Sequence, residues 1–210
     1  MTTGSVWEEE DFVGGHVALD FLNTAGGANK ARDVERLVDY GAALRWGTAT
    51  KLLTEDEASQ LTRLAHTGPQ TAQHALDSLR AFRETLHICL MAEQAGSEWP
   101  WYERSKVEKQ IKAALCEASL DRGDERFLWT ASAQQCGLAL LLARIAIATE
   151  SLLRSDDLPR MRNCERCSWL FIDRGRGKPR RWCSMAACGS RAKSARYYRR
   201  HKEGQNRDGV

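Results

Sequence analysis

Apolar residues recur at helical spacing over most of the first 150 residues, which predicts a mainly α-helical body. In "HVALDFLNTA", Val17, Phe21 and Leu22 share one side of a helix. A glycine-rich turn follows, and the apolar positions of "DVERLVDYGAALRWG" then predict a second helix that begins near residue 33. Trp46 is the last large apolar position of this second helix.

Helix-start signals divide the middle of the chain. Thr54 and Glu57 have the spacing of a capping box, which predicts a helix from residue 55. Pro69 suits the first turn of the next helix, whose apolar positions continue to about Ala95. Another helix is predicted to begin near Pro100. These signals divide this part of the chain into successive helices.

The last part of the body holds the most apolar stretch. "ERFLWTAS" predicts a short strand, and "AQQCGLALLLARIAIATESLLRS" predicts one buried helix at the centre of the core. Arg144 interrupts its apolar run, so we expect no membrane span. The boundary of the body is expected in "SDDLPRM".

Charge divides the chain in two. Residues 160–202 contain 14 Lys and Arg against Glu165 and Asp173, a net charge of +12, and residues 203–210 carry −1. Because the whole chain carries +3, residues 1–159 carry −8. This asymmetry predicts a polyanionic partner for the C-terminal end. The acidic N-terminus, "MTTGSVWEEEDF", lacks the pattern of a signal peptide, so we expect a cytoplasmic protein.

Four cysteines, in the pairs Cys164-x2-Cys167 and Cys183-x4-Cys188, predict a structural Zn²⁺ site. Disulfides are disfavoured in the cytoplasm, a redox CxxC lacks its βαβ context, and a catalytic zinc would keep an open position. We expect a hairpin with "SWLFI" as one strand and "RRWCS" as the other, holding both pairs at its open end. Three aromatic residues are expected to form a small core separate from that of the body, namely Trp169, Phe171 and Trp182.

A basic helix is predicted after the last cysteine, in "GSRAKSARYYRRHK". A helix fixed at its start by a zinc site can present side chains to a DNA major groove. The predicted DNA-binding residues are Arg191, Lys193, Arg196, Arg199 and Arg200, with Arg180 and Arg181 supporting them. The alternatives are a solvated charged helix and an acidic protein partner.

The cysteine-rich segment resembles the CGNR zinc finger family, whose hallmarks are "WLF-D" after the first pair, "RRWCSM", and "CGNR-K". "GGHVALDFLNT" is similar to the start of the domain that usually precedes this finger, named putative stress-induced transcription regulator. The resemblance covers nearly the whole chain and implies a bacterial, DNA-binding regulator with the four cysteines as zinc ligands. Ser190 replaces the signature Asn, and the turn "RGRGKP" departs from the usual Ser-Arg-Asn type.

The predicted architecture is therefore mainly α, a helical N-terminal domain with a small zinc-bound β-hairpin plus helix. Residues 1–158 are expected to form an acidic regulatory domain, residues 159–203 the finger, and residues 204–210 a tail. Asp20 and Asn23 are interpreted as caps of buried backbone ends. The alternative is a pocket for a small-molecule effector, lined by His16, Asp20, Asn23 and Trp46.

The leading functional hypothesis is a transcription regulator that binds duplex DNA, as a homodimer, through one structural Zn²⁺ finger. The alternatives are an RNA-binding or ribosome-associated zinc protein and a zinc- or redox-responsive sensor. A nucleophile elbow, a phosphate loop and a catalytic zinc motif are absent from the sequence, so we expect no enzymatic activity.

Overall fold

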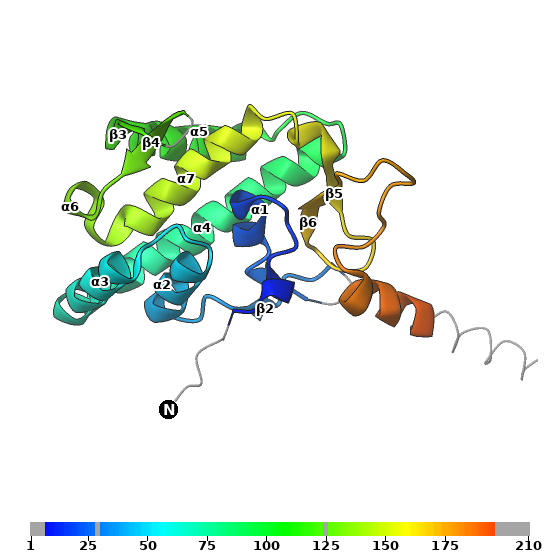
Figure 1. Cartoon of the computed structure of the whole chain (residues 1–210), viewed down its shortest axis with the longest axis horizontal. Helices are drawn as coiled ribbons and strands as arrows, with labels where there is room; N and C mark the ends of the chain where they lie inside the picture. Colours follow the sequence, from blue (N-terminus) through cyan, green and yellow to red (C-terminus); the bar gives the residue numbers. More distant parts are fainter. Residues whose placement is uncertain (1–6, 28–29, 124–125, 196–210) are drawn as a thin grey trace, which may run out of the picture.

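The computed structural model describes residues 7–27, 30–123 and 126–195 and has the predicted mainly α architecture (Figure 1). The body contains η1 (Glu9–Asp11), α1 (Val17–Leu22), β1 (Ala25–Gly26), β2 (Val34–Glu35), α2 (Tyr40–Ala49), α3 (Glu55–Thr67), α4 (Pro69–Gln94), α5 (Trp101–Cys116), β3 (Ala118–Arg122), β4 (Phe127–Ala131), α6 (Ala133–Cys136), η2 (Gly137–Ala139) and α7 (Leu140–Leu153). The C-terminal part contains η3 (Leu158–Arg160), β5 (Met161–Asn163), β6 (Leu170–Ile172) and the π-helical turn η4 (Met185–Gly189), which continues as helix over residues 190–195.

The long helix α4 crosses the whole body, and α1, α2, α3 and α5 all pack against it (Figure 1). α7 packs on α5 and α1 and closes the core. Phe21 of α1 contacts both Trp46 of α2 and Phe82 of α4, with ring centroids 5.7 and 6.4 Å apart. The core is thus built from one face of each helix, as the helical spacing of apolar residues predicts.

The predicted helix starts in the middle of the chain are confirmed. Thr54 and Glu57 form a reciprocal capping box at α3, with 3.0 and 3.2 Å hydrogen bonds between side chains and backbone. Pro69 is the first residue of α4, and α5 begins directly after Pro100.

The helix predicted from residue 33 is wrong over its first turns. Val34 lies in β2 and pairs with Gly26 in a short antiparallel ladder, and α2 begins only at Tyr40. Asp39 caps α2 by accepting a 2.6 Å hydrogen bond from the Ala42 N–H, so this acid marks the true helix start. Val34 and Val38 are both about half exposed, so their helical spacing did not reflect burial.

The apolar segment 133–153 is helical but not one straight helix. Gly137, with φ +51, separates α6 from α7, because a left-handed residue cannot continue an α-helix. By length and composition Ala133–Leu153 is apolar enough to cross a membrane. In the fold, however, α7 is a core helix, and Arg144 forms a bidentate ion pair with Glu57 and donates to the carbonyls of Leu52 and Ala131.

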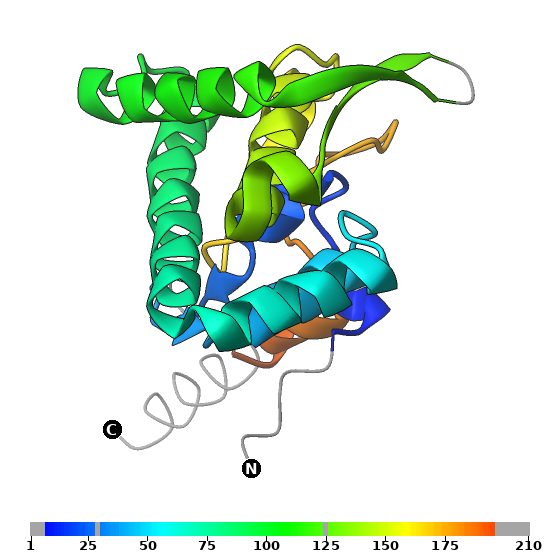
Figure 2. The same cartoon turned by 90° about the vertical axis from the view of Figure 1, so that its left-hand side faces the viewer.

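The predicted strand near residue 128 is confirmed as β4, and it has a partner that the helical pattern concealed. β3 directly follows α5 and pairs with β4 in an antiparallel hairpin that opposes Leu120 to Trp129. Figure 2 shows this hairpin projecting from the end of α5, away from the rest of the body.

The hairpin of the finger differs from the predicted one. β6 pairs with β5, Met161 opposite Ile172, whereas residues 180–184 form no strand. Pro179 has no N–H to donate to a ladder, and Asp173 accepts hydrogen bonds from Gly175 and Arg180 that shape the following loop.

β6 lies between two cores. Leu170 and Ile172 belong to the core of the body, together with Met161 of β5, whereas Phe171 faces the four cysteines. This alternation is the period of two expected of a strand buried on both faces. The finger and the body thus have distinct cores, as predicted, but the two cores are not independent, because one strand contributes to both.

Hydrogen bonds also join β6 to the body. The Asn23 side chain accepts from the Leu170 N–H at 3.0 Å and donates to the Leu170 carbonyl at 2.9 Å, as an extra strand would. The Ile172 N–H donates to the Gly14 carbonyl at 2.9 Å. Arg174 pairs with Asp157 at 2.6 Å and also donates to the Gly15 carbonyl. The finger is thus fixed on the body by strand-like contacts.

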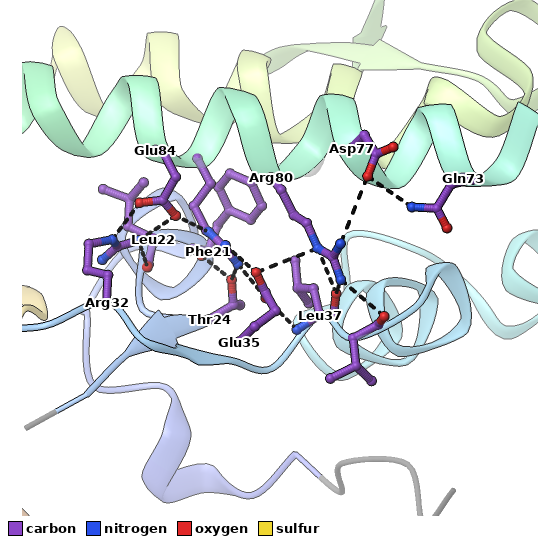
Figure 3. A network of polar contacts seen from close by, with 12 residues as sticks. Phe21, Leu22, Thr24, Arg32, Glu35, Leu37, Gln73, Asp77, Arg80 and Glu84 are labelled. Carbon is purple, nitrogen blue, oxygen red and sulfur yellow. Dashed lines mark hydrogen bonds and ion pairs between the residues drawn. The ribbon is translucent and has the colours of Figure 1, made fainter.

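A network of ion pairs fixes the β1–β2 hairpin on α4 (Figure 3). Arg83, only 3% exposed, donates to both oxygens of Glu35 and to Glu84 and Thr24. Arg32 extends from the loop between the two strands and forms a second bidentate pair with Glu84. The buried charge of Arg83 is compensated by these two carboxylates. Partial burial alone would raise the pKa of Glu35 and of Glu84, but hydrogen bonds from the arginines outweigh it and lower both pKa values.

Candidate metal centre and its basic surface

The four predicted ligands converge at one point of the finger. Cys164 and Cys167 lie in the connection between β5 and β6, Cys183 lies two residues before η4, and Cys188 lies within it. All four are buried, and their sulfur atoms lie within 4.8 Å of one another.

The spacing of the sulfurs fits zinc and excludes a disulfide in this arrangement. The Sγ atoms of Cys167 and Cys183 are 3.7 Å apart. A tetrahedral ion with Zn–S bonds of about 2.3 Å places its sulfurs about 3.8 Å apart, whereas a disulfide requires about 2.05 Å. Four thiolates complete the tetrahedral shell, so the site suits one structural Zn²⁺, and this ion would supply the cross-links that hold the finger together.

The four thiols contact one another closely enough to shift their pKa values in opposite directions. Hydrogen bonds from Cys167 and Cys183 lower the pKa of Cys164, whereas the hydrogen bond with Cys164 raises the pKa of Cys167. A divalent cation at this point would hold the cysteines as thiolates and offset their negative charges.

Aromatic side chains close the metal site from outside. Phe171 is fully buried against the cysteines, with Trp169 and Trp182 half-buried beside it, which confirms the predicted small core. The guanidinium of Arg180 lies 4.5 Å from the Phe171 ring centroid, and that of Arg181 lies 5.0 Å from that of Trp182. These contacts cover aromatic rings that pack on the cysteine cluster.

The predicted DNA-binding residues fall into three groups. Arg191 and Lys193 are exposed on helical residues 190–195, with no ion pair or hydrogen bond from their side chains in the described part of the chain. Arg180 and Arg181 are instead paired with Asp173 and Glu165, so each of the two guanidinium groups has a carboxylate beside it. Arg196, Arg199 and Arg200 lie outside the described residues.

Sequence reasoning missed three further cations of the same surface. Arg176 and Lys178 are exposed in the loop between β6 and Cys183, and Arg166 lies between the first two ligands. None of the three has an ion pair within the described ranges. The signal for Arg166 was its position, because a residue within the spacer of a zinc-binding pair is held next to the metal centre, whereas Arg176 and Lys178 lie between the two pairs.

The residues predicted for an effector pocket, His16, Asp20, Asn23 and Trp46, are hydrogen-bonded or packed within the fold, and Asn23 also lines a cavity between the body and the finger. His16 caps α1 by accepting from the Ala18 N–H, and Asp20 accepts a 2.8 Å hydrogen bond from the Gly14 N–H. Asn23 bonds the backbone of Leu170, and Trp46 is fully buried against Phe21. Each side chain has a structural role, which agrees with the interpretation of Asp20 and Asn23 as caps of backbone groups.

Comparison with protein-family models assigns both parts of the chain. Residues 15–156 match the model described as putative stress-induced transcription regulator, and residues 160–201 match the CGNR zinc finger. No curated protein matches the chain. The two models together cover the helical body and the four-cysteine cluster. The chain therefore belongs to the family of putative stress-induced transcription regulators, and its C-terminal CGNR finger holds one structural zinc ion.

Proposed function

We propose that the protein is a cytoplasmic transcription regulator that binds duplex DNA through the helix following Cys188. The observation that supports this is the placement of Arg191 and Lys193. Both side chains are solvent-exposed and without an ion-pair partner in the described residues, on a helix whose start is fixed by a zinc ligand. Arginines that pack into the body, by contrast, are paired with carboxylates, as the buried Arg83 and the half-buried Arg144 are. Cations left without carboxylate partners suit phosphate groups.

An RNA-binding role is less well supported by the same surface. Single-stranded RNA readers stack bases on exposed aromatic rings. Phe171 is fully buried, and Trp169 and Trp182 pack on the zinc cluster. The packing of the three rings against the cluster thus argues against an open aromatic platform of the kind that this alternative requires.

A regulator without enzymatic activity suits the metal site. Four protein thiolates leave no coordination position for water or substrate, so the ion serves the fold. Burial of all four cysteines also disfavours a redox sensor, which needs an accessible thiolate.

The test is salt-dependent binding to duplex DNA. If the five predicted cations of the basic helix meet phosphates, log affinity falls with log salt at a slope of about −4 to −5. The double variant Arg191→Gln, Lys193→Gln is expected to make this slope shallower by about two and to weaken binding, with zinc content unchanged.

The matched control is Arg45→Gln, Arg63→Gln, which removes two exposed arginines from the body. This control is expected to retain the parent slope. If both double variants bind duplex DNA as the parent does, the proposal is wrong. Binding of single-stranded RNA that exceeds duplex binding at equal salt would favour the alternative.

We further propose that the protein acts as a homodimer, since a single finger gains affinity by pairing two half-sites. The β3–β4 hairpin supports this, because Leu120, Phe127 and Trp129 lie on one face of it and are about half exposed. Two-stranded hairpins are marginally stable without a packing partner. The variant Leu120→Lys, Trp129→Lys is expected to sediment as a monomer, whereas Ser119→Lys, on the opposite face, is expected to remain dimeric. A monomeric parent at micromolar concentration would end this proposal.

A further inference from the structure

A cavity of about 280 Å³ lies between the body and the zinc finger. One side is formed by the β1–β2 hairpin, with Gly26 and Val34, and the other by Trp169, three of the zinc ligands and the start of the helix at residues 190–195. Its lining is mostly apolar, with guanidinium groups among it. Cavities with this combination, and of about this size or larger, are typical of small-ligand sites.

Both walls are held in place independently of any ligand. The β1–β2 hairpin is fixed on α4 by the Arg83–Glu35 and Arg32–Glu84 pairs (Figure 3). The finger wall is fixed by the zinc ligands themselves. Gly26 permits the two walls to approach closely, because a Cβ atom at this position would lie 2.6 Å from the Trp169 indole nitrogen. The cavity is therefore preformed between two rigid elements.

The cations around the cavity differ in their partners. Arg36 is bonded to both oxygens of Asp11 at 2.6 and 2.7 Å and stacks on Trp7. The side chains of Arg166 and Arg191 make no hydrogen bond or ion pair with any other described residue, although both residues line the cavity. Each guanidinium offers five N–H donors in a planar fork that matches a carboxylate.

From this geometry we propose that the cavity binds a small aromatic carboxylate, with its ring against Trp169 and Val34 and its carboxylate on Arg166 and Arg191. The volume limits the ligand to about one or two fused rings. Four thiolates around Zn²⁺ carry a net charge of about −2 nearby, so a single negative charge on the ligand is favoured over a dianion.

The cavity also links a bound ligand to DNA binding, and this link rests on the proposed function. Arg191 lies both on the cavity and on the helix proposed to bind DNA. A ligand carboxylate and a DNA phosphate would therefore compete for the same guanidinium. Ligand binding is expected to weaken binding to DNA, which would make the protein a regulator released by its effector.

The experiment uses the zinc-loaded full chain and three probes of increasing size, namely benzoate, phenylacetate and 1-naphthoate. Binding is followed by the NMR signal of the Trp169 indole N–H, assigned by its loss in Trp169→Phe. At least one probe is expected to shift this signal saturably. The corresponding neutral amide is expected to bind at least about 10-fold more weakly, since it lacks the charge that guanidinium groups favour.

Variants test whether the shift reports this cavity. Arg166→Gln, Arg191→Gln is expected to weaken binding about 10-fold or more, whereas Arg176→Gln, Lys178→Gln removes equal charge from the nearby loop and is expected to bind as the parent does. Val34→Trp fills the cavity without changing charge and is expected to abolish binding. Zinc content is measured for each variant to exclude loss of the finger.

Saturable binding that survives both the cavity-filling and the double arginine variants would overturn the proposal, as would the absence of a saturable shift with all three probes. The effect on DNA is measured separately, and a saturating concentration of the probe is expected to weaken binding to duplex DNA several-fold. If the chain binds no DNA, the proposed function fails while the NMR titration still decides on the cavity.

Discussion

At the scale of single residues, Asp20 is expected to make the stability of the fold depend on pH. Burial raises the pKa of Asp20 to about 6 from an ordinary value of 3.8, although the Gly14 N–H favours the ionised form. The folded state therefore holds the proton more tightly than the unfolded chain does. This stabilisation is present below pH 4 and is lost as the pH rises toward 6, where an ionised, half-buried carboxylate remains.

Asp20→Asn is expected to raise the free energy of unfolding at pH 7.5 by up to about 3 kcal/mol. Its amide oxygen can still accept from Gly14, and it carries no charge. The advantage should disappear near pH 4, where Asp20 is protonated. Thermal unfolding of Asp20→Asn and of the parent at both pH values measures this. An equal gain at both pH values would contradict the explanation.

Asn23 is the residue that most directly joins finger and body. Asn23→Ala leaves the Leu170 N–H and carbonyl buried without partners, which is expected to cost about 2–4 kcal/mol of stability in urea unfolding. Gln73→Ala, which removes an exposed amide bonded to Asp77, is expected to cost less than about 0.5 kcal/mol. Equal effects would show that the Asn23 bonds contribute little.

At the scale of elements, the sequence predicted helices best where a chemical signal marks their start. Thr54 with Glu57, and Pro69, act within a few residues of themselves, so local sequence suffices. The strands were predicted poorly because their partners are distant or unexpected. Val34 of β2 and Val38 have helical spacing but are both exposed, and the partner of β6 was β5 rather than residues 180–184. The zinc ligands were predictable because two short spacers are enough to define them.

Because β6 contributes to both cores, loss of a zinc ligand is expected to affect the body as well as the finger. Cys183→Ser is expected to lose zinc, retain most of the far-ultraviolet helical signal, and unfold at a lower temperature than the parent. The body weakens because Leu170 and Ile172 belong to its core. Circular dichroism with elemental analysis measures this. An unchanged melting temperature for the body helices would show that the core of the body is independent of the finger.

At the scale of the whole molecule, the two family matches divide the chain between residues 156 and 160, but the packing does not. Met161, Leu170 and Ile172 extend the core of the body across that division. The charge asymmetry, by contrast, does follow it, with an acidic body and a basic finger. Composition thus predicted the electrostatic organisation correctly, whereas packing between sequence-distant segments could not be inferred from either segment alone.

A truncated chain of residues 1–158 is expected to be less stable and less soluble than the full protein. It lacks the three core side chains of β5 and β6 and would expose the apolar surface that they cover. Binding of a hydrophobic dye and thermal unfolding, compared with the full chain, test this. A truncated body with parent stability and no dye binding would show that the finger is dispensable to it.

The pairing of Asn23 with Leu170 joins residues 147 positions apart, which sets an order for events during synthesis. Domains emerging from the ribosome generally fold from the N-terminus onward, but this body stays incomplete until β6 has been made. The strand in turn packs on a cysteine cluster whose last two members, Cys183 and Cys188, follow it in the chain. A newly made chain in a zinc-poor cell would therefore wait with part of its core uncovered, so the supply of metal governs how much of the newly made protein reaches its native state.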